Sequence, residues 1–274
     1  IDPSQRDAFA QTLDKPQVLA FRTTDAEPTI SMETGYFVAE LRRPVLPVWA
    51  RNVSELQVTV VDVTPTNFHE LRPLLEWWVF TPADFSRSKL APRAKKLAIA
   101  GTKNKWGQHP IDPAELLGRK AGPGMFYIEL GSSEVTKGPF EDGGRQKVLV
   151  NFTDIGVVSK LSPTRGLVWA TQLSTGKPLP GATVSVRDAA GKLRWSGSTD
   201  AEGIAVLPGT ERFTGNAEDD GRGSEFRIFV QHRADWTMVN PTRSGGLSPW
   251  NFNVSVDYDR APTKLRGFMH TDRG

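Results

Sequence analysis

The chain has 274 residues, a formal net charge of +3 and no cysteine. The absence of cysteine excludes disulfides, thiolate metal sites and cysteine nucleophiles from this sequence. Lysines and arginines are spread along the chain instead of forming one basic face, which argues against nucleic acid as a partner. No run approaches the roughly 18 apolar residues of a membrane-spanning helix.

Two tandem units fit this length. Residues 1–28 are interpreted as a tail or linker from a preceding domain, and both chain ends resemble cuts within a longer protein. We expect the first unit to span residues 29–152. Its predicted strands are short runs rich in apolar and β-branched residues: LPVWARN at 46–52, LQVTVVDV at 56–63, RAKKLAIAG at 93–101, MFYIEL at 125–130 and KVLVNF at 147–152. The first run places Leu46, Val48 and Ala50 on one face.

Two short helical insertions are expected within the first unit. The stretch NFHELRPLLEWWVF breaks the strand pattern, and Pro73 limits it to one or two helical turns. In IDPAELLG, Asp112 is the expected N-cap, Pro113 takes the first position and Gly118 ends the helix. The basic residues between 87 and 105 are interpreted as a solvated strand and loop, because mixed surface charge is the norm.

The second unit is expected to span residues 153–262. GVVSKL and GLVWATQL are its first strands. Three further runs, ATVSVRD, KLRWSGS and IAVLP, are joined by turns that begin with Asp and end with Gly, at 188–191 and 200–203. This pattern predicts a β-meander with one apolar face, whose expected inward residues are Val184, Val186, Leu193, Trp195, Ile204 and Val206. FRIFVQ is another strand, and residues 263–274 are interpreted as the first strand of a following domain.

Short strands at close spacing with one buried face predict an all-β fold of tandem antiparallel β-sandwiches with short helical insertions. Candidate reactive groups are few. The histidines are far apart and show no metal-binding spacing: His69, His109, His232 and His270. The acidic loop at 216–227 resembles a calcium loop, but Arg227 stands where a bidentate Glu is needed.

Other side chains are also interpreted as structural. The carboxylate pairs Asp219–Asp220 and Glu141–Asp142 lie in polar, glycine-rich loops, which are poor places to raise a pKa for acid–base work. Four tryptophans are interpreted as packing residues instead of a sugar-binding platform: Trp77, Trp78, Trp106 and Trp250. Sequons occur at Asn52, Asn151 and Asn253.

Three steps in the second unit carry a resemblance to a known family. The unit begins with Thr153-Asp154 followed by Gly156, continues through TGKPLPGA at 175–182, and contains the hairpin Thr199-Asp200-x-x-Gly203. This order resembles a macroglobulin-like domain of the bacterial alpha-2-macroglobulins. The likeness covers residues 29–274 and is strongest in the second unit. The ending FMHTDRG is similar to the start of the family's next domain.

The resemblance implies a role without chemistry in this chain. Such proteins are protease traps: a bait segment is cleaved, the molecule rearranges, and a Cys–Gln thioester tethers the protease. Since the chain has no cysteine, it carries no thioester. The resemblance therefore implies a scaffold segment that is not an enzyme, with no catalytic, cofactor-binding or metal-binding residue and no cofactor. It also implies a periplasmic, inner-membrane-anchored parent protein.

The implied partners are neighbouring domains of the same chain, target proteases of the full-length protein and, by family analogy, a peptidoglycan synthase. Two other classes stay open. The TGKPLPGATV turn also occurs in carboxypeptidase-regulatory-like β-sandwiches, which would make the chain a stalk or binding module of a cell-surface or outer-membrane protein. A carbohydrate-active β-sandwich would require clustered carboxylates beside an exposed Trp77 or Trp106.

Overall fold

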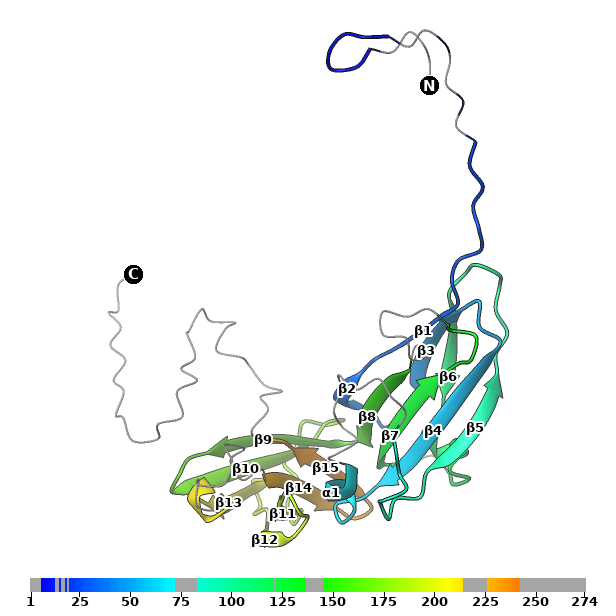
Figure 1. The fold of residues 1–274 in the computed structure, drawn as a ribbon. Coiled ribbons are helices and arrows are strands. Elements are labelled where there is room, and N and C mark those ends of the chain that lie inside the picture. The colour runs from blue at the N-terminus through cyan, green and yellow to red at the C-terminus, as the bar shows by residue number, and fades with distance from the viewer. Residues whose placement is uncertain are drawn as a thin grey trace. The chain divides into compact units, whose positions relative to one another are not determined.

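The structure is a computed structural model, which describes residues 6–12, 15, 18, 20–71, 83–120, 122–136, 145–213 and 226–241. The described strands alternate with only short helical segments, so the all-β prediction is confirmed. The chain forms two compact units (Figure 1). Among the described residues, the first contains those up to Asp154 together with Ala234–Trp236, and the second contains those from Ile155 to Arg233 and from Thr237 onward. No helix among the described residues has the length and apolar character needed to cross a membrane.

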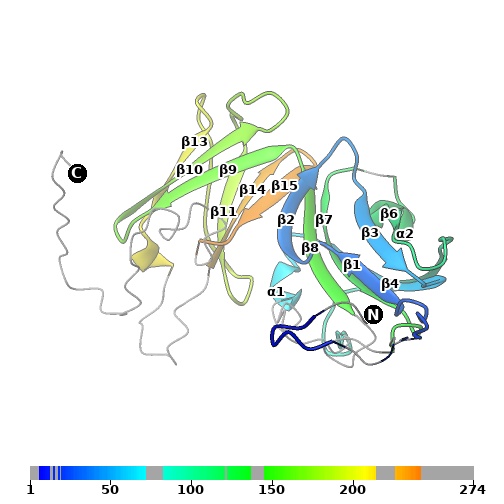
Figure 2. The ribbon, with the colours of Figure 1, turned by 90° about the horizontal axis from the view of Figure 1, so that it is seen from above.

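The first unit is built from two sheets (Figure 2). The smaller sheet has the order β1 (Thr29–Met32), β3 (Leu46–Arg51) and β6 (Gly107–Ile111). The larger has the order β2 (Gly35–Glu40), β8 (Gln146–Thr153), β7 (Gly124–Gly131), β4 (Glu55–Val63) and β5 (Arg93–Ala98). β2 pairs with β8 in parallel, whereas the other pairs in both sheets are antiparallel. The expectation of purely antiparallel sheets therefore fails at β2.

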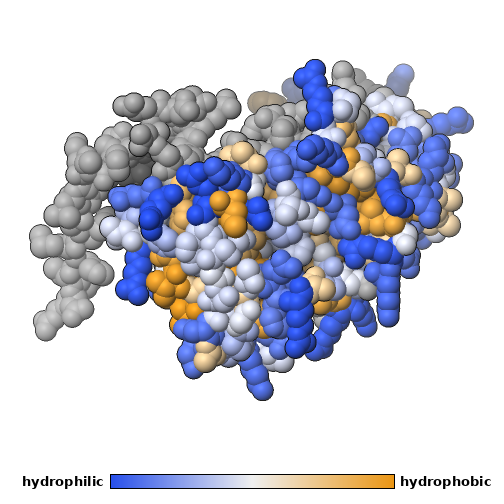
Figure 3. All heavy atoms as spheres, turned by 90° about the horizontal axis from the view of Figure 1, so that it is seen from below, coloured by the Kyte–Doolittle hydropathy of each residue, from blue (hydrophilic) through white to orange (hydrophobic). Residues whose placement is uncertain are grey.

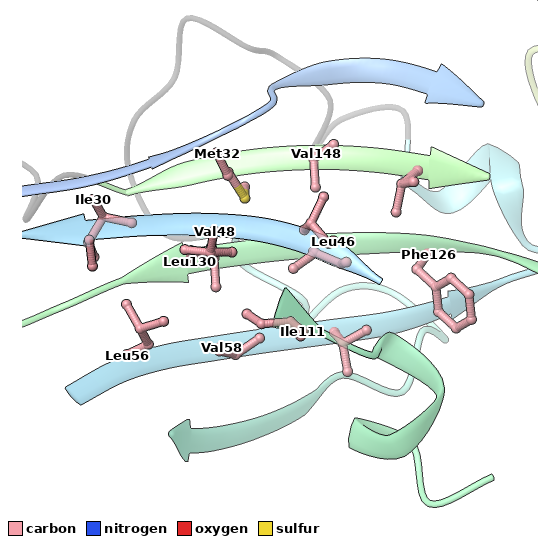
Figure 4. Close-up of a cluster of buried hydrophobic side chains, with 14 of the residues drawn as sticks. Ile30, Met32, Leu46, Val48, Leu56, Val58, Ile111, Phe126, Leu130 and Val148 are labelled. Atoms are coloured by element: carbon pink, nitrogen blue, oxygen red, sulfur yellow. The ribbon is translucent and has the colours of Figure 1, made fainter. Parts of the chain in front are cut away.

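The space between these sheets is filled by apolar side chains from alternate strand positions (Figure 4). Leu46, Val48 and Ala50 all point inward with at most 4% exposure, as their alternation predicts. They meet residues of the larger sheet such as Phe126 and Val148, which are also buried. Burial of this kind is the main source of stability in a sandwich, at about 25 cal/mol per Å² of apolar surface.

Short helices occur where proline and capping residues favour them. α1 covers Phe68–Leu71, and α2 covers Pro113–Leu116. The Asp112 side chain accepts a hydrogen bond from the Ala114 N–H, so the predicted N-cap is confirmed. Gly118 has a φ of +69° just beyond α2, a conformation that glycine adopts at little cost.

The second unit also has two sheets. One has the order β13 (Ile204–Pro208), β10 (Arg165–Gln172) and β9 (Ile155–Leu161). The other has the order β12 (Leu193–Ser198), β11 (Thr183–Asp188), β14 (Phe226–His232) and β15 (Asp235–Val239). Between them lies a second apolar cluster that includes Val168, Val184 and Ile228, each fully buried.

The predicted meander is wrong at its third strand. β11 and β12 form the expected hairpin, but β13 pairs with β10 in the opposite sheet instead of with β12. The turn at Asp200–Gly203 therefore carries the chain from one layer of the sandwich to the other. This crossing adds Ala205 and Leu207 to the core, which needs apolar side chains from both layers.

The predicted inward face is also wrong at three positions, two on β13 and one on β12. Val206 and Leu193 are 51% and 48% exposed, and Ile204 is only partly buried. Ala205 and Leu207 take the inward positions of β13 at 2% exposure each. Every residue of IAVLP is apolar, so the alternation of the sequence does not distinguish the two faces. The register of its pairing with β10 determines which side chains of β13 face the core, because a shift of one residue turns each side chain to the other face.

Candidate functional site

The residues considered for metal or sugar chemistry do not come together. His69 lies on α1, His109 on β6 and His232 at the end of β14. Across the part of the chain that the structure describes, no group of three or more potential metal ligands occurs. Trp106 is 50% exposed, and the charged group over its ring is the Arg51 guanidinium, 5.3 Å from the ring centre. A cation stacked on tryptophan is a stabilising surface contact and supplies no acid–base pair.

Several sequence candidates lie outside the described residues: Trp77, Trp78, Trp250, His270, Asn253, Asp219, Asp220, Glu141 and Asp142. Asn151 is described and fully buried, and its side-chain Nδ2 donates to the Trp236 carbonyl at 3.2 Å. A glycan on Asn151 is incompatible with this burial. The basic strand β5 is exposed at Arg93, Lys95 and Lys96, as the sequence predicts.

A buried polar network lies on β7 of the first unit. The Glu129 carboxylate is 3% exposed and accepts hydrogen bonds from Arg145 Nη1 at 3.0 Å and from the Ala83 N–H at 3.0 Å. The Tyr127 hydroxyl also donates to it at 3.2 Å. Burial, followed by the nearby Glu129 charge, raises the pKa of Tyr127. Since each oxygen of the carboxylate has a partner, the network stabilises the fold and leaves no free base for chemistry.

The first family step, Thr153-Asp154, holds a strand end in place. Thr153 Oγ1 donates to Asp235 Oδ1 at 2.7 Å, and the Asp154 N–H donates to Asp235 Oδ2 at 2.8 Å. All three residues belong to the first unit. Burial raises the pKa of Asp235 even though these two donors and the Trp236 N–H lower it. Hydrogen bonding therefore accounts for the threonine at position 153 and the aspartate at position 235.

The later steps are also structural. Thr199 Oγ1 donates to the Leu179 carbonyl at 2.6 Å and accepts from the Ala182 N–H at 2.9 Å. Asp200 Oδ1 accepts from the N–H groups of Glu202 at 3.0 Å and Ile204 at 2.9 Å, which closes the turn.

Glycine is required at the last position of this turn. Gly203 has a φ of +75°, and an added Cβ would lie 2.4 Å from the Ala170 carbonyl oxygen. Any larger residue would therefore meet both backbone strain and a direct clash. Together with Thr199 and Asp200, Gly203 holds the two layers of the second unit in place.

One surface was missed by the sequence reading. On the outer face of the sheet β13–β10–β9, apolar side chains stand where a sandwich facing water carries polar ones. Val158, Trp169 and Val206 are 52%, 42% and 51% exposed, with Leu173 nearby at 53%. Figure 3 draws one face of the molecule, on which orange hydrophobic residues lie among blue hydrophilic ones. The available signal was GLVWATQL, in which both alternating sets contain apolar residues.

Comparison with known proteins gives consistent results for the family. Residues 152–259 match the family described as the bacterial alpha-2-macroglobulin MG3 domain. The chain is 17% identical over 292 residues to an alpha-2-macroglobulin homolog of Nostoc sp., an alignment that covers 100% of this chain and 14% of the relative. The chain thus spans about a seventh of that relative's length.

Solved structures show the same fold. Native alpha-2-macroglobulin from Escherichia coli, in a crystal structure spanning domains NIE-MG1, is similar with a TM-score of 0.57 at 14% identity. That likeness covers 81% of this chain and 100% of the other. A mutant Salmonella alpha-2-macroglobulin is similar with a TM-score of 0.54 at 16% identity, over 93% of this chain and 14% of that one.

Proposed function

We propose that this chain, whose residues 152–259 match the bacterial alpha-2-macroglobulin MG3 domain, is a non-catalytic scaffold segment of a periplasmic, membrane-anchored protease trap. The observation that carries the proposal is that the residues typical of the family make structural contacts in this chain. Thr153, Thr199, Asp200 and Gly203 close turns and hold strand ends. None of them faces a cluster of reactive groups.

The domain arrangement follows from the same proposal. We assign residues 29–152 and 153–262 to two consecutive domains, although Thr153, Asp154 and Ala234–Trp236 fall in the first compact unit. A linker at 1–28 would precede them, and the first strand of another domain, at 263–274 and outside the described residues, would follow. The Escherichia coli structure spans two named domains, which supports a two-domain assignment. In the parent protein the partners would be neighbouring domains and target proteases. A peptidoglycan synthase is the remaining proposed partner, and its co-purification with the parent protein would test it.

The proposal is tested by comparing this chain with its parent polypeptide. Each is incubated with a serine protease, and covalent complexes and residual activity are measured. We expect the parent to capture the protease. The 274-residue chain, at micromolar concentration, should neither form a covalent complex with the protease nor inhibit it. Inhibition by the isolated chain would overturn the scaffold role. A parent that fails to capture any protease would overturn the trap.

The gene sequence beyond Gly274 separates the proposal from the stalk module. Continuation into Tyr-Arg-Pro-Gly and later a Cys-x-Glu-Gln step supports a thioester trap, and continuation without that cysteine supports a relative that lacks the thioester. A transporter barrel or adhesin repeats would instead support the stalk module. Fractionation of cells expressing the parent protein tests its proposed periplasmic location.

A further inference from the structure

The strongest unassigned feature is the apolar outer face of the sheet β13–β10–β9, here named the β10 face. Its residues form two rows across the three strands. Trp169 of β10 lies opposite Val158 of β9 and Ile204 of β13. In the next row Leu167 lies opposite Lys160 and Val206. Directly opposed side chains have Cβ atoms about 4.5–5.5 Å apart, so these rows form one continuous surface.

The β10 face is unlike an ordinary solvated sheet face. A shallow, open depression of about 320 Å³ is lined by Leu167 and Val206 together with Lys160 and Arg165. Trp169 is held in place because its Nε1–H donates to the Glu202 carbonyl at 3.1 Å. Apolar patches of this kind, rimmed by polar residues, mark interaction sites in soluble proteins.

From these observations we infer that the β10 face is a permanent docking surface for another domain of the same parent polypeptide, which covers Trp169, Val158 and Val206 and places carboxylates opposite Lys160 and Arg165. The inference rests on the proposed function, because only a segment of a larger assembly has such further domains. The chain spans 14% of the relative's length, so most of the relative lies outside the matched region.

Charge favours this occupant over a second copy of the chain. The side chains of Lys160 and Arg165 make no ion pair with the residues that the structure describes. A symmetric pair of chains would bring both cations to one interface twice and leave them uncompensated, which disfavours association. A permanent interface is also expected to be more apolar than a transient one, which fits the exposed side chains of Val158, Trp169 and Val206.

The absence of cysteine from the chain makes the test direct, since an introduced thiol is its only thiol. Val206→Cys and Val158→Cys are placed separately in the 274-residue chain and in the parent polypeptide. The rate of maleimide labelling at each position is read by peptide mass spectrometry. The matched control is Ser196→Cys, an exposed position on β12 in the other sheet.

We expect both cysteines on the β10 face to react freely in the 274-residue chain and at least about tenfold more slowly in the parent, where reaction requires local opening. Ser196→Cys should react equally in both. Adding Lys160→Glu and Arg165→Glu to the parent should restore several-fold faster labelling of Cys at position 206, whereas Lys192→Glu, at an exposed turn, should not.

Equal labelling of the β10 face in chain and parent would overturn the inference. Protection that appears in the 274-residue chain as its concentration rises, together with a dimer mass in solution, would overturn it in favour of a second copy. Protease capture is measured on the same parent samples. Capture with an open β10 face contradicts this inference alone, whereas a protected face without capture contradicts the proposed protease trap alone.

Discussion

The two outer sheet faces of this protein contrast sharply. In the five-stranded sheet of the first unit the two strands β7 and β8 are buried on both sides: every residue of β7 is buried, and so is every residue of β8 except Gln146. A neighbouring segment of the same chain covers part of the outer face of this sheet. The ring of Phe85 packs edge-on against the ring of Tyr127, with 5.9 Å between the ring centres, and the Ala83 N–H donates to the Glu129 carboxylate. On the β10 face, by contrast, alternate residues of β10 are exposed or only partly buried. A sheet face that the same chain covers contributes to the stability of the fold, whereas an apolar face that stays exposed is typical of an interaction site.

The largest effect is expected at the turn that joins the two layers of the second unit. In Gly203→Ala the new Cβ lies 2.4 Å from the Ala170 carbonyl oxygen, and φ is already +75°. We expect a loss of about 4 kcal/mol in the free energy of unfolding, measured with urea.

Gly176→Ala is the control for this turn, because Gly176 shares the positive φ but has open space around its Cβ position. The αL conformation alone should cost about 1 kcal/mol. Equal losses in the two variants would show that the contact with Ala170 does not constrain the turn.

The contrast between the covered and the open face is tested by truncating one leucine on each. Leu149, on the covered outer face, is 1% exposed, and Leu173, beside the β10 face, is 53% exposed. Leu149→Ala should destabilise the chain by about 3 kcal/mol through lost burial and a cavity. Leu173→Ala should stay within about 0.5 kcal/mol. A large loss at Leu173 in the isolated chain would mean that this side chain is already covered there.

A smaller effect is expected for the buried network on the covered face. Glu129→Gln removes the negative charge that pairs with Arg145, whose Nη1 lies 3.0 Å from Glu129 Oε1. We expect it to lower the free energy of unfolding by about 2 kcal/mol. The exposed pair of Lys96 and Glu55, at 2.7 Å, is the control. Glu55→Gln should change the unfolding free energy by no more than about 0.5 kcal/mol. Thermal melts of both variants measure the difference, and equal values would remove the distinction between the two pairs.

The smallest effect is the pH dependence of stability at Asp235. Burial raises the pKa of this carboxyl above its ordinary value of 3.8. Its contribution to stability is therefore fully present below that value and is lost as pH rises through the raised pKa. Asp235→Asn removes this loss, so the stability of the variant relative to the original chain should improve as pH rises from about 4 towards neutrality.

Asp84 provides the opposite sign. It is fully exposed, and hydrogen bonds from Ser86 lower its pKa, so its contribution is present above 3.8 and is lost as pH falls. Asp84→Asn should therefore lose relative stability with rising pH. Urea unfolding from below pH 3.8 to neutrality measures both slopes, the one for Asp84 below 3.8 and the one for Asp235 above it. Parallel slopes for the two variants would contradict the assignments.

Local patterns in the sequence were sufficient for the elements whose cause is local. The cap at Asp112, the two turns that begin with Asp and end with Gly, and the buried set Leu46, Val48 and Ala50 are as predicted. Each depends on residues a few positions apart, through a side-chain cap, a turn geometry or strand alternation. The residues of the family steps were also evident, although their hydrogen-bond partners were not.

Only the tertiary structure decided the features that depend on distant partners. IAVLP is apolar at every position, so its pairing with β10 chose Ala205 and Leu207 for the core and left Val206 outside. The parallel pairing of β2 with β8 joins residues more than a hundred positions apart. The exposure of Trp169 likewise followed from the sheet that formed around it. Alternation in a strand defines two faces, but contact with another layer is what makes one of them the inside.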